Sequence, residues 1–191
     1  MRRYLLVFSA AAIVAMTGCA DDKRLSQISD FVPTKFSETS AGLLLHAVAV
    51  GETTGGANLL NTAGMSDGMF TSVMTNTLKR NALLAPPGGA RWRIDSALDI
   101  GGPATIFGDH SIRANIRYVL RDVGTGTAVF DKVVQTSSTR GSQSTAAEVS
   151  TILFTGTAML EQRQKNSIDI AVRANLDGFL TALATWDGAR Q

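Results

Sequence analysis

Two segments near the middle of the chain alternate between apolar and polar residues, and this pattern restricts the fold more than any other feature. The first covers residues 92–100 and the second covers residues 112–120. The series expected to be buried are Trp92, Ile94, Ser96, Leu98 and Ile100, then Ile112, Ala114, Ile116, Tyr118 and Leu120. Successive side chains of a strand point to opposite faces of a sheet, so each segment predicts a strand with one buried and one hydrated face.

The sequence predicts a third strand directly after these two. Residues 122–126 read Asp-Val-Gly-Thr-Gly, which is typical of a short hairpin turn. They lead into an apolar and β-branched stretch at residues 128–136. We expect the three neighbouring strands to pair antiparallel.

One further strand and two helices complete the prediction. The apolar run Leu43–Val50 indicates a buried strand, and residues 51–64 form a loop rich in Gly, Thr and Asn. A helix follows with Ser66 or Asp67 as its N-cap, and the Pro-Pro-Gly-Gly sequence at 86–89 is expected to end it. A second helix is predicted by an apolar stripe at helical spacing, which consists of Ile168, Val172, Leu176, Phe179, Leu180 and Leu183.

This order of elements, β-α-β-β-β-α, predicts an α+β fold with a mainly antiparallel sheet and helices packed on one face. The domain is expected to cover residues 42–186. Residues 19–41 are polar and aperiodic, which favours a flexible tether. Residues 146–160 leave helix and irregular structure open, because Gly and Thr interrupt an otherwise apolar segment.

Residues 1–18 are laid out as a secretory signal peptide. Two arginines follow the first Met, an apolar run continues to Met16, and small residues precede Cys19. That run is shorter than the ~20 apolar residues that a membrane-spanning helix needs. The layout resembles a bacterial lipoprotein signal, in which Cys19 is lipidated and becomes the new N-terminus, although Met16 stands where such signals usually carry Leu.

The lipoprotein resemblance also implies a location. Two or three acyl chains on Cys19 would make release from a membrane slow. In such lipoproteins Asp directly after the cysteine favours retention in the inner membrane, and here Ala20 occupies that position. The resemblance therefore implies the periplasmic face of the outer membrane, while Asp21 and Asp22 keep the inner membrane as an alternative.

Charge and cysteine content exclude some classes of protein. The chain has 18 Lys and Arg against 16 Asp and Glu, and loss of Arg2 and Arg3 with the signal would leave 16 of each. A neutral chain with scattered Lys and Arg gives no reason to expect binding to nucleic acid. Because Cys19 is the only cysteine, no disulfide is expected.

The sequence Gly-Met-Ser-Asp-Gly at 64–68 matches the G-x-S-x-G elbow of serine hydrolases. The remaining catalytic residues would have to come from Asp95, Asp99 or Asp109 and from His110. Such an elbow needs a parallel sheet, whereas the predicted strands are antiparallel neighbours. We therefore prefer a helix N-cap at Ser66 and do not expect an enzyme.

No cofactor or metal site is predicted. The loop at residues 51–64 has neither G-x-x-x-x-G-K-[ST] nor G-x-G-x-x-G, and it contains no Lys. His46, placed in the first predicted strand, and His110 have no second His or Cys at ligand spacing.

Arg113, Arg117 and Arg121 are four residues apart on one predicted strand, so they share its hydrated face. They form a possible partner-binding face for an anionic partner. The alternative, which we favour, is an ordinary solvated face on which arginines pair with aspartates across the sheet. The aspartates available for such pairs are Asp95, Asp99 and Asp131.

Most of the expected domain resembles a family of small proteobacterial envelope lipoproteins. The matching segments are 69–84, 92–95, 112–122, 126–134 and 172–180. They include a helix that ends in a Leu-Leu step, a D-x-x-T-G-like turn at Asp122, Thr125 and Gly126, and a closing helix with Arg-Ala-Asn at 173–175. The pattern is more distantly similar to auxiliary lipoproteins of ABC-type envelope transporters and to lipoproteins that assist lipopolysaccharide assembly. The resemblance implies no catalytic residues.

Three functional hypotheses follow. The first is a non-enzymatic accessory or binding subunit in envelope transport or outer-membrane assembly, anchored through lipid on Cys19 and bound to an envelope protein. The second is a module that binds peptidoglycan or a periplasmic synthase through the arginine face or an exposed strand edge. The third is a serine hydrolase that uses Ser66.

Overall fold

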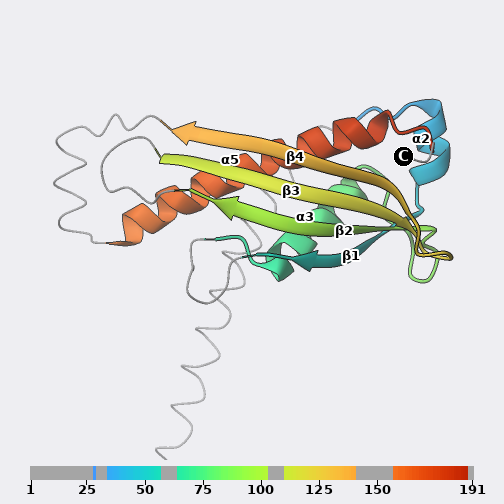
Figure 1. Ribbon diagram of the computed structural model, residues 1–191, viewed down its shortest axis with the longest axis horizontal. Helices are drawn as coiled ribbons and strands as arrows, with labels where there is room; N and C mark the ends of the chain where they lie inside the picture. Colours follow the sequence, from blue (N-terminus) through green and yellow to red (C-terminus); the bar gives the residue numbers. More distant parts are fainter. Residues whose placement is uncertain (1–27, 29–33, 57–63, 103–109, 141–156, 189–191) are drawn as a thin grey trace, which may run out of the picture.

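The fold is α+β, as the sequence predicts, in the computed structural model (Figure 1). The structure describes residue 28 and residues 34–56, 64–102, 110–140 and 157–188. The described helices are α2 (Glu38–Leu44), α3 (Asp67–Arg80) and α5 (Thr157–Ala184), and the strands are β1 (Val48–Thr54), β2 (Trp92–Gly101), β3 (His110–Asp122) and β4 (Ala128–Arg140).

The four strands form one sheet in the order β1-β2-β3-β4. β2 pairs antiparallel with β3, and β3 with β4, which confirms the predicted pairing. β1 pairs parallel with β2, as a strand–helix–strand connection through α3 allows. The hairpin turn between β3 and β4 is held by the Asp122 carboxylate, which accepts the Thr125 N–H at 2.9 Å, and Gly126 adopts a φ of 72° that favours glycine.

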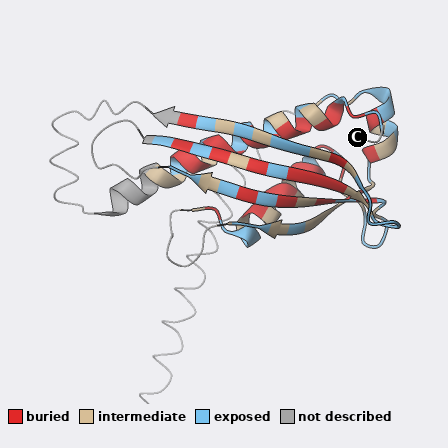
Figure 2. Cartoon of the chain, viewed as in Figure 1, coloured by how far each residue is buried: buried red, intermediate tan, exposed pale blue. Residues whose placement is uncertain are grey.

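Helices α3 and α5 cover the same face of the sheet (Figure 1). In β2 the even-numbered residues from Trp92 to Leu98 are buried beneath them, and in β3 the even-numbered residues from Ile112 to Leu120 are buried as well (Figure 2). The predicted alternation is therefore confirmed. The opposite face of β2, β3 and β4 carries no described helix, and its side chains are mostly exposed.

A buried hydrogen-bond network joins α5 to β3 and β4. The Tyr118 hydroxyl donates to Oδ1 of Asn175 at 2.8 Å, and Nδ2 of Asn175 donates to the main-chain oxygens of Ala114 at 3.1 Å and Val134 at 2.7 Å. The ring of Phe179, one turn further along α5, stacks on the Tyr118 ring with centroids 4.2 Å apart. Burial raises the pKa of Tyr118 well above its usual 10, so this hydroxyl stays a donor.

Helix α2 packs near the end of α5. Ser37 is its N-cap, since Oγ of Ser37 accepts the Ser40 N–H at 3.1 Å. The hydroxyl of Ser40 is buried and bonds to the main-chain oxygens of Ala184, at 2.9 Å, and of Trp186. The Trp186 ring packs edge-on against Trp92, with centroids 5.5 Å apart. Helix α2 thus begins before residue 42, where the domain was expected to start.

The predicted strand Leu43–Val50 is wrong in its first half. Leu44 is the last residue of α2, His46 has a φ of 55° in the turn that follows, and β1 begins only at Val48. Leu44 and Val48 are both fully buried, so one apolar run supplies core residues to two elements. His46 consequently does not lie in a strand.

The ends of helix α3 and strand β4 also differ from the predicted ends. Helix α3 ends at Arg80, well before the Pro-Pro-Gly-Gly sequence, because Asn81 caps it and Ala82 adopts a φ of 57°. Strand β4 continues past residue 136 to Arg140, since its Ser and Thr residues still pair with β3. The predicted closing helix is confirmed as α5, whereas most of the ambiguous stretch at 146–160 lies outside the described residues.

The Asn175 network should dominate the attachment of α5. Replacing Asn175 by Ala should lower the free energy of unfolding by about 2–4 kcal/mol, because it leaves the Tyr118 hydroxyl without its acceptor and creates a cavity. Tyr118→Phe should cost about 1 kcal/mol, since it removes a single hydrogen bond. Urea unfolding of the two variants and of the double variant measures these costs. A cost for Asn175→Ala of about 0.5 kcal/mol or less, as for a surface substitution, would contradict this role.

Candidate functional site on the open face of the sheet

The face of the sheet opposite α3 and α5, called the open face below, carries most of the charge of the strands. It is formed by the odd-numbered residues of β2, β3 and β4. Its charged members are Arg93, Asp95 and Asp99 on β2, Arg113, Arg117 and Arg121 on β3, and Asp131 on β4. The structure therefore brings the three predicted arginines together with all three predicted aspartates.

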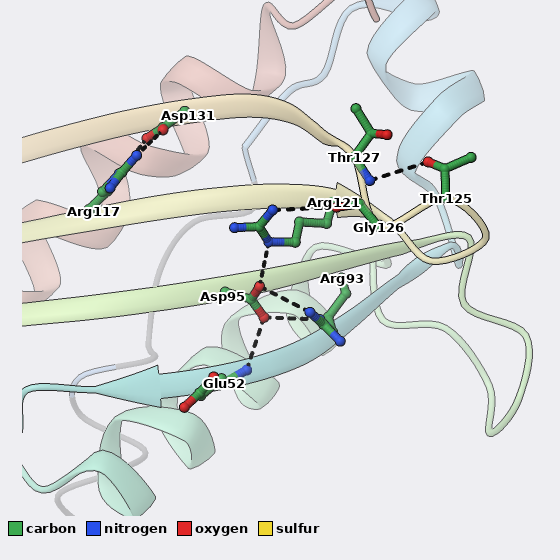
Figure 3. Close-up of polar contacts among 9 residues, drawn as sticks. All are labelled: Glu52, Arg93, Asp95, Arg117, Arg121, Thr125, Gly126, Thr127 and Asp131. Atoms are coloured by element: carbon green, nitrogen blue, oxygen red, sulfur yellow. Dashed lines mark hydrogen bonds and ion pairs between the residues drawn. The ribbon is translucent and has the colours of Figure 1, made fainter.

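Asp95 binds two of the arginines on this face. Its Oδ1 pairs with Nε of Arg93 at 3.0 Å, its Oδ2 with Nε of Arg121 at 3.0 Å, and the Glu52 N–H donates to Oδ1 at 3.1 Å (Figure 3). The Asp95 side chain is only 19% exposed. Burial alone would raise the pKa of Asp95, but the hydrogen bonds from Glu52, Arg93 and Arg121 outweigh it and hold the pKa below its usual 3.8.

Gly51 on β1 makes room for this cluster. A Cβ atom at Gly51 would lie 2.1 Å from Oδ1 of Asp95 and 2.6 Å from Cγ of Arg93. Both distances are too short, so a side chain here would displace the carboxylate. Gly51 lies in β1 and not in the predicted loop at residues 51–64, and its role could not be predicted because a single glycine in a glycine-rich segment does not indicate what packs against it.

Arg117 is neutralised by a different carboxylate. Its Nε donates to Oδ1 of Asp131 at 2.8 Å, and a second guanidinium nitrogen donates to Oδ2, so the pair is bidentate (Figure 3). The hydrogen bonds from Arg117 lower the pKa of Asp131, and Asp131 in turn raises the pKa of Arg117. The favoured prediction, that arginines of this face pair with aspartates across the sheet, is therefore confirmed for Arg117 and Arg121.

Arg113 differs from the other two arginines of the row. It is exposed and forms no ion pair with another described residue. Its cross-strand neighbours are Gly101 on β2 and Ser137 on β4, neither of which carries charge. A pocket of about 400 Å³ lies beside it, lined by Asp99, Gly101, Gly102, Ser111 and Arg113. Arg113 thus lies on a solvated face, as favoured, but pairs with none of the three predicted aspartates, and the sequence did not single out Gly101 or Ser111.

Ser66 is the N-cap of α3, which confirms the interpretation favoured from the sequence. Its Oγ accepts the Met69 N–H at 3.2 Å at the start of α3, and the Asp67 carboxylate accepts the Gly56 N–H at 2.7 Å. Asp95, one of the acids considered for a hydrolase, is bound to Arg93 and Arg121 instead. Ser66 and Asp67 of the motif at 64–68 therefore form local hydrogen bonds at the start of α3.

The remaining candidates for chemistry are scattered. His46 lies in the turn before β1, His110 is the first residue of β3, and Asp109 lies outside the described residues. Within the ranges that the structure describes, no three His, Cys, Asp or Glu side chains gather as a metal site would require.

The predicted lipidation site, Cys19, lies outside the described residues, as do the signal segment and Ala20. Lipidation and location therefore stay predictions. In the part of the chain that is described, none of the helices is both long enough and apolar enough to cross a bilayer.

Comparison with known proteins gives only distant structural likeness. No family model matches the chain, and no curated protein matches it. Among solved structures, a candidate lipoprotein from Caulobacter crescentus is 16% identical, with a TM-score of 0.38 over 76% of this chain and 98% of that one. A DUF330-family protein from Xanthomonas campestris is 9% identical, with a TM-score of 0.41 over 71% of this chain and 87% of that one.

A further similar structure is a PelC dodecamer from Paraburkholderia phytofirmans. It is 14% identical, with a TM-score of 0.39 over 82% of this chain and 96% of that one. We take the function of this chain from its own residues.

The Asp95 cluster predicts a dependence of stability on pH. Because the folded-state pKa of Asp95 lies below 3.8, its contribution to stability is present above pH 3.8 and is lost as the pH falls through the folded-state value. The free energy of unfolding should therefore fall less steeply below about pH 4 in Asp95→Asn than in the wild type. Equal slopes in Asp95→Asn and the wild type would contradict the assignment.

Proposed function

We propose that this protein is a lipid-anchored, non-enzymatic binding subunit of the cell envelope that works in transport or in outer-membrane assembly and contacts its partner through the open face. One observation carries the proposal: Arg113 forms no ion pair with another described residue and lies beside a pocket, on the face of the sheet that the described helices leave uncovered. The other two arginines of the row already have carboxylate partners. Among the described residues of the row, Arg113 is therefore the arginine that an anionic group of a partner could bind without displacing a carboxylate.

The hydrogen bond made by Ser66 supports a binding protein over a hydrolase. A nucleophile must present its hydroxyl to a substrate with a base beside it. The Ser66 oxygen instead accepts a main-chain N–H of α3. In this proposal the hydrolase hypothesis is set aside, and activity against esters is not expected.

The anchor is the second part of the proposal. Lipid on Cys19 would hold the domain at a membrane surface, and Ala20 favours the outer membrane over the inner membrane, as the lipoprotein resemblance implies. Restriction to a surface raises the effective concentration of the domain toward partners in the same membrane. A modest affinity at the open face would then be sufficient for partner binding.

The same arginine also supports the second hypothesis, a module that binds peptidoglycan or a periplasmic synthase. Peptide stems of peptidoglycan carry carboxylates, which a guanidinium binds bidentately. The two functions differ in what the protein should co-purify with. Retention on purified sacculi would favour the peptidoglycan-binding module, and capture of a membrane protein would favour the accessory subunit.

In-cell crosslinking followed by mass spectrometry tests the proposal. The wild type should capture an envelope partner, while Cys19→Ser should lose it because the domain is no longer held at the membrane. Arg113→Ser should reduce capture by about tenfold, equivalent to ~1.4 kcal/mol, because the contact with the anionic group is lost. Arg117→Ser is the matched control. Arg117 already forms an ion pair with Asp131, so its replacement should change capture little.

Circular dichroism and urea unfolding of each variant would verify that the fold is intact. Equal capture by Arg113→Ser and the wild type would contradict the assignment of the open face. Equal capture by Cys19→Ser would contradict the anchor.

A further inference from the structure

We infer that the pocket beside Arg113 binds a zwitterionic ligand, in which a carboxylate and an ammonium group belong to one short peptide. The inference rests on the proposed binding role of the open face and adds the chemical class of what that face recognises. It is carried by two opposite charges that line the same pocket, Arg113 and Asp99, neither of which forms an ion pair with another described residue.

Arg113 would bind the carboxylate of the ligand. A guanidinium offers paired N–H donors whose geometry matches the two oxygens of a carboxylate. In Arg117 such donors are already taken by Asp131, and in Arg121 they are taken by Asp95 and the main-chain oxygen of Gly126. The hydroxyl of Ser111, two residues before Arg113 on the same face and also lining the pocket, provides a further donor.

Asp99 decides between a simple anion and a zwitterion. Its carboxylate lines the pocket, and Nδ2 of Asn115 donates to its Oδ2 at 3.4 Å, so Asn115 helps to position it. A ligand with negative charge alone would be repelled by this carboxylate. A ligand that also places an ammonium group beside Asp99 turns the repulsion into attraction.

Gly101 provides the space between the two charges. It is the direct cross-strand partner of Arg113, and a Cβ atom built on it would meet nothing within 4 Å. Asp99, two residues away on β2, is the diagonal neighbour of Arg113, and such positions lie about 7–8 Å apart in an antiparallel pair. That spacing, with the reach of both side chains, suits charges at the two ends of a dipeptide.

The neighbouring glycine fixes one wall of the pocket. A Cβ atom at Gly102 would lie 2.2 Å from the main-chain oxygen of Ser111, so the chain approaches β3 too closely there for any side chain. The position beside it, Gly101, is open. The pocket therefore combines a closely packed main chain with an empty side-chain site, and this site can be filled by mutation without a clash.

Three dipeptide probes test the inference on the purified full-length lipoprotein in detergent micelles. They are alanyl-alanine, which is zwitterionic, its N-acetylated form, which is only anionic, and its C-terminal amide, which is only cationic. Titration followed by saturation-transfer NMR should give a Kd of about 1 mM or tighter for alanyl-alanine. Each singly charged probe should bind at least about tenfold more weakly, because it lacks one charge partner.

Variants assign the charges. Arg113→Gln should weaken binding of the zwitterionic probe at least about tenfold and abolish binding of the N-acetylated probe. Asp99→Asn should abolish the preference for the zwitterion over the N-acetylated probe. Gly101→Val should block all three probes by filling the pocket while both charges stay in place. Arg117→Gln, the paired arginine of the same row, should bind like the wild type.

Three outcomes would overturn the inference: no binding of alanyl-alanine up to about 10 mM, equal affinity for the N-acetylated probe, or unchanged binding in Arg113→Gln. Its failure can be told apart from failure of the proposed function. If in-cell capture depends on Arg113 while the dipeptide does not bind, the binding face stands and the ligand class is wrong. If alanyl-alanine binds as expected but capture does not depend on Arg113, the pocket stands and the partner role is wrong.

Discussion

The packing of α5 across β3 and β4 is the constraint on which the rest of the structure depends. Asn175 satisfies the Tyr118 hydroxyl and two strand carbonyls at once, and Phe179 stacks on the same tyrosine ring. Stacked aromatic pairs contribute about 0.5–1.5 kcal/mol beyond their burial, and a buried donor left without an acceptor costs about 1–3 kcal/mol. The helix is thereby fixed in rotation and in register along the strands, which an apolar stripe alone would leave less specified.

Because α5 and α3 occupy one face of the sheet, the opposite face of β2 to β4 is left to charged side chains. There the carboxylates of Asp95 and Asp131 bind Arg93, Arg121 and Arg117, so three of the four arginines of this face have a carboxylate partner. Arg113 lies at the end of the row, opposite a glycine, and forms no ion pair with another described residue. The same strand therefore supplies a solvated face with ordinary ion pairs along most of its length and a candidate binding pocket at one end.

The fold could largely be predicted from the sequence, because alternation in β2 and β3 and the stripe of α5 reflect burial directly. The predicted strand Leu43–Val50 was wrong because two short elements, α2 and β1, share this apolar run. Residues on both sides of the turn at His46 are buried, so the hydrophobic pattern does not show where the helix ends and the strand begins. The arginine row was also predictable, since four-residue spacing on a strand guarantees a common face. The sequence could not predict which arginine lacks an ion pair among the described residues, because pairing depends on the cross-strand register. The role of Gly101 likewise depends on its position opposite Arg113.

Site-specific photocrosslinking in cells tests the central claim, that the open face is the binding surface, most directly. Val133 lies on the open face with 47% exposure, and Ile170 lies on α5 with 50% exposure, so a photoreactive residue at either position is equally accessible. We expect a discrete crosslinked partner from position 133, lost in Cys19→Ser, and none from position 170. Crosslinks from position 170 with none from position 133 would contradict it and would place the partner on the helical face.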